Sequence, residues 1–132
     1  MQVVDAMQFV AHRLPADRLT VQSYGPGGFT ISGVRYHSAV LLTTTRLWPV
    51  PIAAMPAIRL ELFAPLFEAG IEVDLLLLGT GAAFALPPPD LLQALRARRL
   101  AVEAMTTPAA CRTFNLLASE ERRVAALLLT LP

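Results

Sequence analysis

The sequence predicts an α/β fold: a three-layer domain whose central sheet is mixed and largely parallel, with an antiparallel β-rich portion at the N-terminus. Residues 73–78 are almost wholly apolar and hold four consecutive leucines, so a strand formed there needs both faces covered. Residues 19–43 alternate between apolar and polar positions around glycine turns. Two proline-led helix starts follow the leucine strand. At this length we expect one domain, residues 1–132.

The first third of the chain predicts antiparallel β-structure. Residues 1–18 show no clean periodicity, and we expect an irregular arm there. Residues 19–24 and 29–32 alternate on either side of Gly25-Pro26-Gly27-Gly28, which is a hairpin signal. A strand rich in branched residues follows at 39–43. Because proline donates nothing to a sheet, Trp48-Pro49-Val50-Pro51 is predicted to be the crossing out of the hairpin region.

The middle of the chain predicts one interrupted helix and the central strand. Residues 56–70 carry apolar side chains at helical spacing, but Pro65 lies inside this stretch. A proline in a helix interior removes a hydrogen bond, so we expect a bend near Glu61 or two short pieces. The leucine strand at 75–78 follows and is predicted to lie at the centre of the sheet.

The last third predicts two helices that alternate with strands. A helix begins around Pro87-Pro88-Pro89-Asp90 and ends at arginines, a charge order that suits the helix dipole. Residues 101–105 form the next strand, which makes a β-α-β unit with a right-handed parallel crossover. A second helix starts with Thr107 as N-cap and Pro108 in its first position and reaches about Ala118. Residues 124–129 are expected to close the sheet.

Composition excludes several function classes. The net charge of +1 gives no electrostatic reason to expect nucleic acid. Although 55% of the residues are hydrophobic, glycines and prolines keep every apolar stretch shorter than the roughly 20 residues of a spanning helix, so no transmembrane segment is predicted. Two histidines and one cysteine, scattered along the chain, give no metal site and no cofactor site. A single cysteine and no secretory signal favour a bacterial-type cytoplasm.

The glycine loop Gly79-Thr80-Gly81 is the first candidate ligand site. It follows the central strand at its carboxyl end, where an α/β sheet places ligands and where uncommitted backbone amides can bind an anion. The dinucleotide motif fails because Phe84 stands where its third glycine belongs, and no Walker lysine exists. The alternative is that the glycines only permit a tight exit from the strand.

The helix that follows offers a polar row beside that loop. Thr107, Cys111 and Asn115 stand four residues apart, and Arg112 supplies a guanidinium that suits an anion. The predicted ligand site therefore comprises these seven residues: Gly79, Thr80, Gly81, Thr107, Cys111, Arg112 and Asn115.

Each of these helical residues also has a structural alternative. Thr107 has a capping role, and Asn115 is able to fasten a neighbouring loop. The helix dipole and Arg112 favour a Cys111 thiolate, but neither histidine is placed beside it as a base, so the alternative is packing. We predict no catalytic residues.

Several motifs resemble one known family. They are Gly28-Phe29-Thr30-Ile31-Ser32-Gly33, Trp48, Gly79-Thr80-Gly81, Pro87, the block Met105-Thr106-Thr107-Pro108-Ala109-Ala110-Cys111-Arg112-Thr113-Phe114-Asn115-Leu116-Leu117, and Glu120-Glu121-Arg122. Together they resemble the family of the mitochondrial NADH:ubiquinone oxidoreductase (complex I) assembly factor 3 and its uncharacterised single-domain prokaryotic relatives. Phe114 replaces an expected tyrosine, and Glu121 an expected glycine. The resemblance implies a three-layer α/β domain, no established catalytic activity and, in the mitochondrial member, a role in assembling a respiratory complex.

These observations predict a non-catalytic interaction or assembly-type protein, with a protein partner or self-association. The alternative is a small-molecule (anion) binding protein or an enzyme that uses the 79–81 loop and the 106–115 segment. If the protein binds a partner, its excess of hydrophobic residues should form an exposed surface patch. Its expected members are Phe9, Trp48, Phe63, Phe67 and Phe84.

Overall fold

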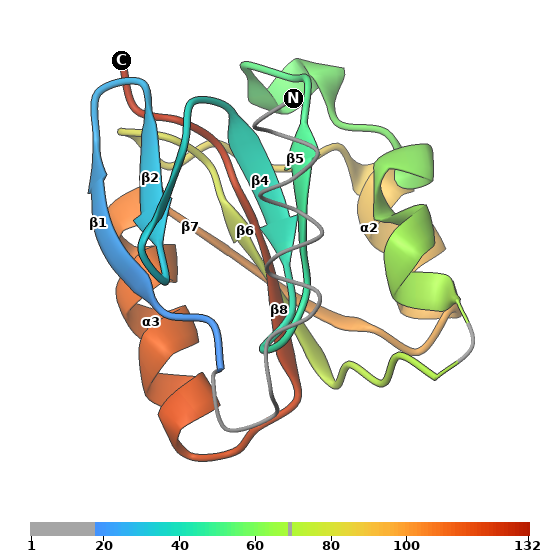
Figure 1. The fold of residues 1–132 in the computed structure, drawn as a ribbon. Helices are drawn as coiled ribbons and strands as arrows, with labels where there is room; N and C mark the ends of the chain where they lie inside the picture. The colour runs from blue at the N-terminus through green and yellow to red at the C-terminus, as the bar shows by residue number, and fades with distance from the viewer. Residues whose placement is uncertain (1–17, 69) are drawn as a thin grey trace.

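The computed structural model describes residues 18–68 and 70–132 (Figure 1). The predicted arm at residues 1–18 lies almost wholly outside the described residues. The elements, in chain order, are β1 (Val21–Gly25), β2 (Gly28–Ile31), β3 (Val34–Tyr36), β4 (Ala39–Leu42), β5 (Leu47–Val50), the 3₁₀ helices η1 (Met55–Ala57) and η2 (Leu60–Phe67), β6 (Leu75–Gly79), α2 (Pro89–Ala97), β7 (Ala101–Met105), α3 (Thr107–Ser119) and β8 (Val124–Leu128).

A five-stranded mixed sheet forms the middle layer, with the strand order β5-β4-β8-β6-β7. β6 pairs in parallel with β7 and β8, whereas β4 pairs antiparallel with β5 and β8. The predicted mixed α/β fold is confirmed, and the leucine strand is an interior strand. The prediction that residues 124–129 close the sheet is wrong, because β8 occupies its middle and all five of its residues are buried.

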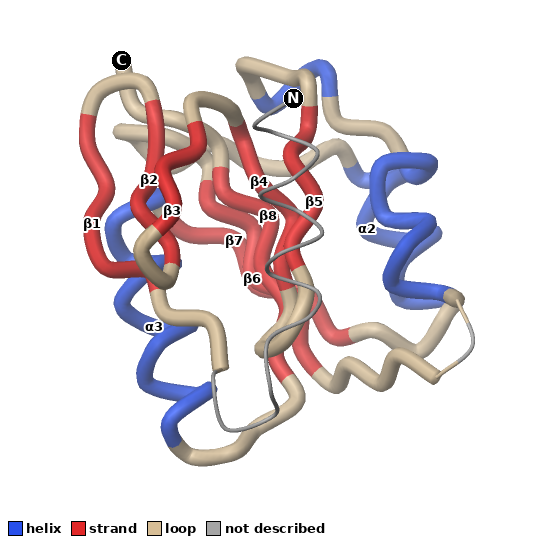
Figure 2. The backbone as a smooth tube through the Cα atoms, in the orientation of Figure 1, coloured by secondary structure: helices blue, strands red, loops and turns tan. Residues whose placement is uncertain are grey.

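Apolar side chains cover both faces of the sheet, as the run of leucines requires. Successive side chains of β6 alternate between the faces: Leu77 joins the core under α3, while Leu76 and Leu78 join the core under α2. All three leucines are fully buried, and each contributes roughly 1.5 to 3 kcal/mol of transfer free energy. Figure 2 shows α3 and the three-stranded sheet on one side of the central sheet and α2 on the other.

The N-terminal strands form a separate antiparallel sheet in the order β1-β2-β3. The turn between β1 and β2 is made at Pro26 and Gly27, and Gly27 has a φ of 79°, as the hairpin prediction requires. Phe29 and Ile31 on β2 are fully buried in the core that α3 shares. The predicted antiparallel β-rich portion is therefore confirmed.

Trp48 and Pro49 lie in β5, at the edge of the five-stranded sheet, so the segment predicted to be the crossing out of the hairpin region is itself a strand. β5 pairs with β4, with Trp48 opposite Leu41 and Pro49 opposite Val40. The sheet tolerates Pro49 because β5 is an edge strand, so the missing amide hydrogen breaks no ladder bond.

The segment between β5 and β6 forms two 3₁₀ helices, η1 and η2, in place of one helix. The two pieces separate at Ile58 and Arg59, and Pro65 lies inside η2, so the predicted interruption near Glu61 is wrong. α2 begins at Pro89, carries Asp90 in its first turn and Arg96 in its last, and so matches the helix dipole at both ends.

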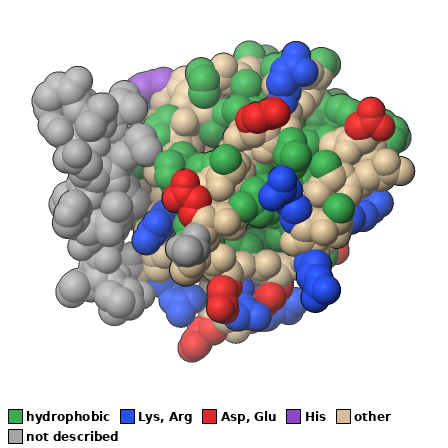
Figure 3. Space-filling view, turned by 90° about the vertical axis from the view of Figure 1, so that its right-hand side faces the viewer, with side chains coloured by type: hydrophobic (Ala, Val, Ile, Leu, Met, Phe, Trp, Pro, Cys, Tyr) green, Lys and Arg blue, Asp and Glu red, His purple; other side chains and the backbone are tan. Residues whose placement is uncertain are grey.

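On the face that carries α2, acidic and basic side chains are interspersed with hydrophobic ones (Figure 3). No helix in the described part of the chain is long and apolar enough to cross a bilayer.

Candidate functional site

The carboxyl end of β6 is bound to the start of α3 through the hydroxyl of Thr107. This hydroxyl accepts a hydrogen bond from the Gly81 amide (2.9 Å) and donates one to the Leu129 carbonyl (2.7 Å). Thr107 is fully buried, and a Cβ added at Gly79 would lie 3.0 Å from its hydroxyl oxygen. The glycine loop and the helix start therefore pack closely, as predicted, and one side chain joins the ends of β6 and β8 to α3.

The N-cap of α3 is Thr106, not Thr107 as the sequence predicted. The Thr106 hydroxyl accepts from the Ala109 amide (3.4 Å), and Pro108 is the second residue of the helix. Two adjacent threonines before a proline fit the capping pattern equally well. The tertiary contacts of Thr107 decide between them, because its hydroxyl is already used by the strand ends.

The backbone amides of the glycine loop are largely used inside the protein. The Thr80 amide donates to the Met105 carbonyl (2.8 Å), and the Gly81 amide donates to Thr107. The position of the loop after β6 predicted uncommitted amides, and for these two residues that prediction is wrong. The loop is therefore a built turn that fixes the chain after β6.

Cys111 lies on the buried face of α3, in the core that this helix covers, and is 1% exposed. Burial raises the pKa of its thiol from the ordinary 9.0 to about 12, and the nearby Arg112 charge opposes this rise without cancelling it. The tendency toward thiolate expected from the helix dipole and Arg112 is therefore outweighed. The alternative interpretation, that the Cys111 side chain packs in the core, agrees with these surroundings.

We expect Cys111 to react with a thiol reagent at neutral pH at least about 100-fold more slowly in the native protein than in the unfolded chain. The raised pKa means that the folded protein keeps this proton to higher pH than the unfolded chain does. The associated stability is therefore complete below pH 9 and is lost as the pH rises toward about 12. Stopped-flow thiol titration with and without denaturant measures the ratio, and equal rates would contradict the prediction.

Arg112 and Asn115 hold β1 in place against α3. Asn115 accepts from the Val21 amide (3.0 Å) and donates to the Val21 carbonyl (2.9 Å), so one side chain bonds both backbone groups of that residue. The Arg112 guanidinium donates to the Tyr24 hydroxyl (3.1 Å). The structure thus brings Gly79, Gly81 and Thr107 together, while the rest of the polar row meets the core or β1. Ligand binding at this place stays a prediction.

The loop between β6 and α2, at the carboxyl end of β6, carries exposed apolar side chains. Phe84 is 55% exposed and Leu86 is 75% exposed, and Ala82 and Ala83 are exposed as well. Phe84 was among the aromatic residues expected at the surface, whereas Leu86 was missed. The signal that could have found it is an apolar run that belongs to neither a helix nor a strand.

The other aromatic residues expected at the surface do not share this exposure. Phe63 belongs to η2 and is fully buried, so that expectation is wrong. Trp48 and Phe67 are partly buried against the core under α2, and Arg98 stacks over the Phe67 ring at 4.6 Å. Phe9 lies outside the described residues.

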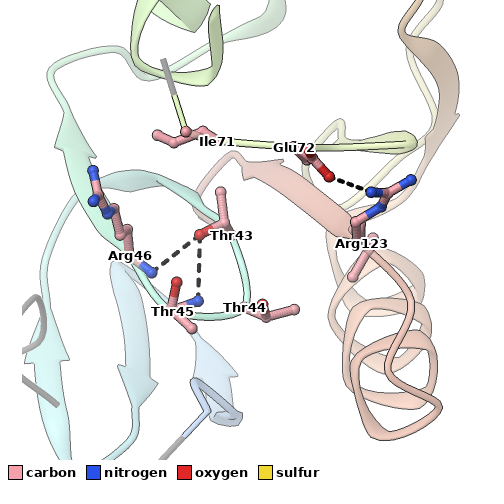
Figure 4. A pocket seen from close by; sticks show the side chains of 9 residues that line it. Thr43, Thr44, Thr45, Arg46, Ile71, Glu72 and Arg123 are labelled. Atoms are coloured by element: carbon pink, nitrogen blue, oxygen red, sulfur yellow. Dashed lines mark hydrogen bonds and ion pairs between the residues drawn. The ribbon is translucent and has the colours of Figure 1, made fainter. Parts of the chain in front are cut away.

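A cavity of about 310 Å³ lies at the opposite end of β6, between the threonine turn 43–46 and residues 70–72 (Figure 4). Three of the polar side chains that border it, those of Thr43, Glu72 and Arg123, are paired within the protein. Thr43 accepts from the amides of Thr45 and Arg46. The Arg123 guanidinium pairs with Glu72 and forms two bonds to Asp74 of 2.9 and 3.0 Å, which raise its pKa.

The pairing of Arg123 was not predicted from the sequence, which indicated only a solvated turn at residues 120–123. β6 and β8 are parallel neighbours that start at Leu75 and Val124, so the residues before them meet. This ion pair is exposed and holds the strand starts together. Within residues 18–68 and 70–132, no group of three or more histidine, cysteine or acidic side chains is placed to hold a metal ion.

Comparison with known proteins identifies the family. The family described as "Protein of unknown function (DUF498/DUF598)" matches residues 21–129, which is most of the chain. The chain belongs to the DUF498/DUF598 family. This family membership confirms the resemblance drawn from the sequence motifs, because relatives of the chain include the complex I assembly factor 3 proteins.

Two sequence relatives and two crystal structures illustrate the DUF498/DUF598 family. An uncharacterized protein of Rhodobacter capsulatus is 38% identical over 117 residues, which cover 89% of each chain. The NADH dehydrogenase [ubiquinone] 1 alpha subcomplex assembly factor 3 of Danio rerio is 37% identical over 85% of this chain, and the match spans 64% of that protein.

The two solved structures have the same fold. An outer membrane protein from Bartonella henselae has a TM-score of 0.79 and 30% identity, and the match covers 87% of this chain and 97% of that one. A Bordetella parapertussis protein has a TM-score of 0.77 and 33% identity, and the match covers 89% and 99%.

Proposed function

We propose that this protein is a non-catalytic interaction or assembly-type protein that binds a protein partner, or a second copy of itself, through the loop at residues 80–88. The observation that carries the proposal is the exposure of Phe84 (55%) and Leu86 (75%), two residues apart on that loop. Large apolar side chains that are exposed near one another mark partner sites, because a partner that covers them removes apolar area from water. Aromatic residues are also over-represented among the residues that dominate binding energy.

The loop presents Phe84 on an ordered backbone. The Thr80 hydroxyl donates to the Ala83 carbonyl (2.9 Å) and accepts from the Ala85 amide (3.1 Å). These two bonds fix the residues on either side of Phe84, and Ala85 packs against the core under α2. A fixed loop loses little conformational entropy when a partner binds, so its apolar area contributes more fully to affinity.

The chemistry of the titratable groups supports the same proposal. The Cys111 thiol is buried with a raised pKa, and the acidic groups nearest the cavity, Glu72 and Asp74, are paired with Arg123. The Danio rerio relative is named as an assembly factor of NADH dehydrogenase. Under this proposal the chain shares an assembly role of that kind and acts in the cytoplasm, which fractionation of the native host would test.

We expect Phe84→Ala with Leu86→Ala to lower recovery of the partner at least about tenfold, because the variant removes the two apolar side chains that the partner would bury. The measurement is a pull-down from the native host, combined with the solution mass of the purified protein. Leu116→Ala is the matched control, since Leu116 is 58% exposed on α3, away from this loop. Equal recovery with the double variant and the control would count against the loop as the binding site.

The alternative is a small-molecule (anion) binding protein or an enzyme at the 79–81 loop and the 106–115 segment. One observation favours it: Arg112 is exposed, forms no ion pair with a described residue, and has the neutral Tyr24 hydroxyl as its partner. A monomer that recovers no partner would support this alternative. A metabolite panel should then contain an anion that raises the melting temperature of the wild type and not of Arg112→Ala.

A further inference from the structure

β7 is an edge strand whose outer backbone groups are open. Among the described strands it pairs with β6 alone, and the Thr80 amide donates to the Met105 carbonyl, so the backbone groups of Met105 face β6. Along a strand, the backbone N–H and C=O groups of successive residues point alternately to one neighbouring strand and to the other side. Glu103 therefore also bonds toward β6, while Val102 and Ala104 present their N–H and C=O groups outward. No hydrogen bond from another described loop or helix reaches these outward groups.

The two edges of the five-stranded sheet differ in their capacity to pair. β5, the opposite edge, contains Pro49, which lacks an amide hydrogen and interrupts any added ladder. β7 contains no proline, and its residues Ala101 and Glu103 are exposed. β7 is thus the edge of this sheet on which an extended segment finds uninterrupted donors and acceptors.

We propose that β7 accepts an extended strand from a different protein, which pairs with Val102 and Ala104 and carries a basic residue opposite Glu103. This inference rests on the proposed interaction function and names the kind of segment that binds. In such strand addition the main-chain bonds give affinity, and the side chains opposite alternate positions give specificity. The acidic Glu103 is the position that selects the partner.

Charge argues for a different protein rather than a second copy. An antiparallel pair of two β7 strands that uses both Val102 and Ala104 places Val102 opposite Ala104 of the second copy. That register places Glu103 directly opposite Glu103 of the second copy, and like charges in that position are destabilising. Glu103 is exposed and has no ion-pair partner among the described residues, so a lysine or arginine would complement it.

The edge of β7 leads directly to the loop of the proposed interaction site. The Met105 carbonyl accepts from Thr80, and the Thr107 amide donates to the Gly81 carbonyl (2.9 Å), so the loop begins beside the end of β7. A strand added to β7 therefore approaches the loop that carries Phe84. One partner segment can use main-chain bonds along β7 and apolar contacts on the loop.

Synthetic peptides that stand in for the partner strand test the inference. The probes are two seven-residue peptides of alternating valine and threonine, one with lysine and one with glutamate at the centre. Titrated into the ¹⁵N-labelled protein, the lysine peptide should bind about fivefold more tightly than the glutamate peptide. The amide signals of Val102 and Ala104 should shift most, because their N–H groups gain partners.

Two variants make the test specific to β7. Glu103→Lys should reverse the preference between the peptides, whereas Glu120→Lys changes the net charge equally on an exposed turn and should leave it unchanged. Ala104→Pro removes an outward amide and no bond to β6, so it should abolish binding of the lysine peptide. If that variant does not fold, the charge reversal at Glu103 decides.

The outcomes separate this inference from the proposed function. Equal affinity for the two peptides, no binding at millimolar concentration, or shifts away from β7 would each overturn strand addition. A host partner that is lost with Phe84→Ala and Leu86→Ala but kept with Glu103→Lys would overturn strand addition alone. A protein that is monomeric in solution and recovers no host partner would overturn the proposed function, even if the lysine peptide bound.

Discussion

Replacing Thr107 by valine is expected to lower the free energy of unfolding by about 3 kcal/mol. Valine keeps the shape of threonine but removes the hydroxyl that joins α3 to the ends of β6 and β8. The Gly81 amide and the Leu129 carbonyl then remain buried without a partner, and each such group costs roughly 1 to 3 kcal/mol. Thr107 is fully buried, so water cannot easily replace the lost bonds.

Urea unfolding followed by circular dichroism measures the effect, with two controls. Thr107→Ser keeps the hydroxyl and loses one methyl group, so it should cost only about 1 kcal/mol. Thr20→Val removes an exposed hydroxyl and should change the free energy of unfolding by less than about 0.5 kcal/mol. If the valine and serine variants at Thr107 were equally stable, the hydrogen bonds would not be the source of the stability.

The Thr107 substitution also links stability to the proposed interaction. The bond from Gly81 to Thr107 fixes the chain two residues beyond β6, at the start of the loop that carries Phe84. Loosening this attachment should weaken partner binding, because the loop would then lose entropy on binding. The fold and the candidate site therefore depend on the same buried hydroxyl.

The parts of the fold that depend on local sequence were predictable. Four leucines in a row specify a strand covered on both faces, and β6 is such a strand. Pro89 and Asp90 specify the start of α2. The strand order was not predictable in the same way, because 75–78 and 124–129 are both continuous apolar runs. Which of them lies in the middle depends on pairing between residues that are distant in sequence.

For the candidate site, the sequence predicted which residues share a row on α3, but not what that row contacts. Helical spacing correctly placed Thr107, Cys111 and Asn115 on related turns, but spacing does not reveal what a face meets. The hairpin from β1 to β2 folds over α3, so Asn115 meets Val21 rather than the mouth of the sheet. The exposed loop escaped full prediction because an apolar run such as residues 82–86 fits a core equally well in sequence.

The second large effect is expected at Gly28, where alanine should lower the free energy of unfolding by about 3 kcal/mol. An added Cβ would overlap the carbonyl oxygen of Tyr36 and lie 3.1 Å from its carbonyl carbon and 3.2 Å from the Cα of His37. These neighbours are backbone atoms, so they cannot move away by changing a rotamer.

The overlap at Gly28 would force β2 away from β3 at the place where both contribute to the core. Phe29 pairs with Tyr36 in the ladder, Phe29 is fully buried, and Tyr36 is 4% exposed. Gly25→Ala is the matched control in the same hairpin, because a Cβ at Gly25 meets no heavy atom of the described residues within 4 Å. Urea unfolding should show the control within about 1 kcal/mol of the wild type. Two variants with the same midpoint would show that the close approach of β2 and β3 does not limit the side chain at Gly28.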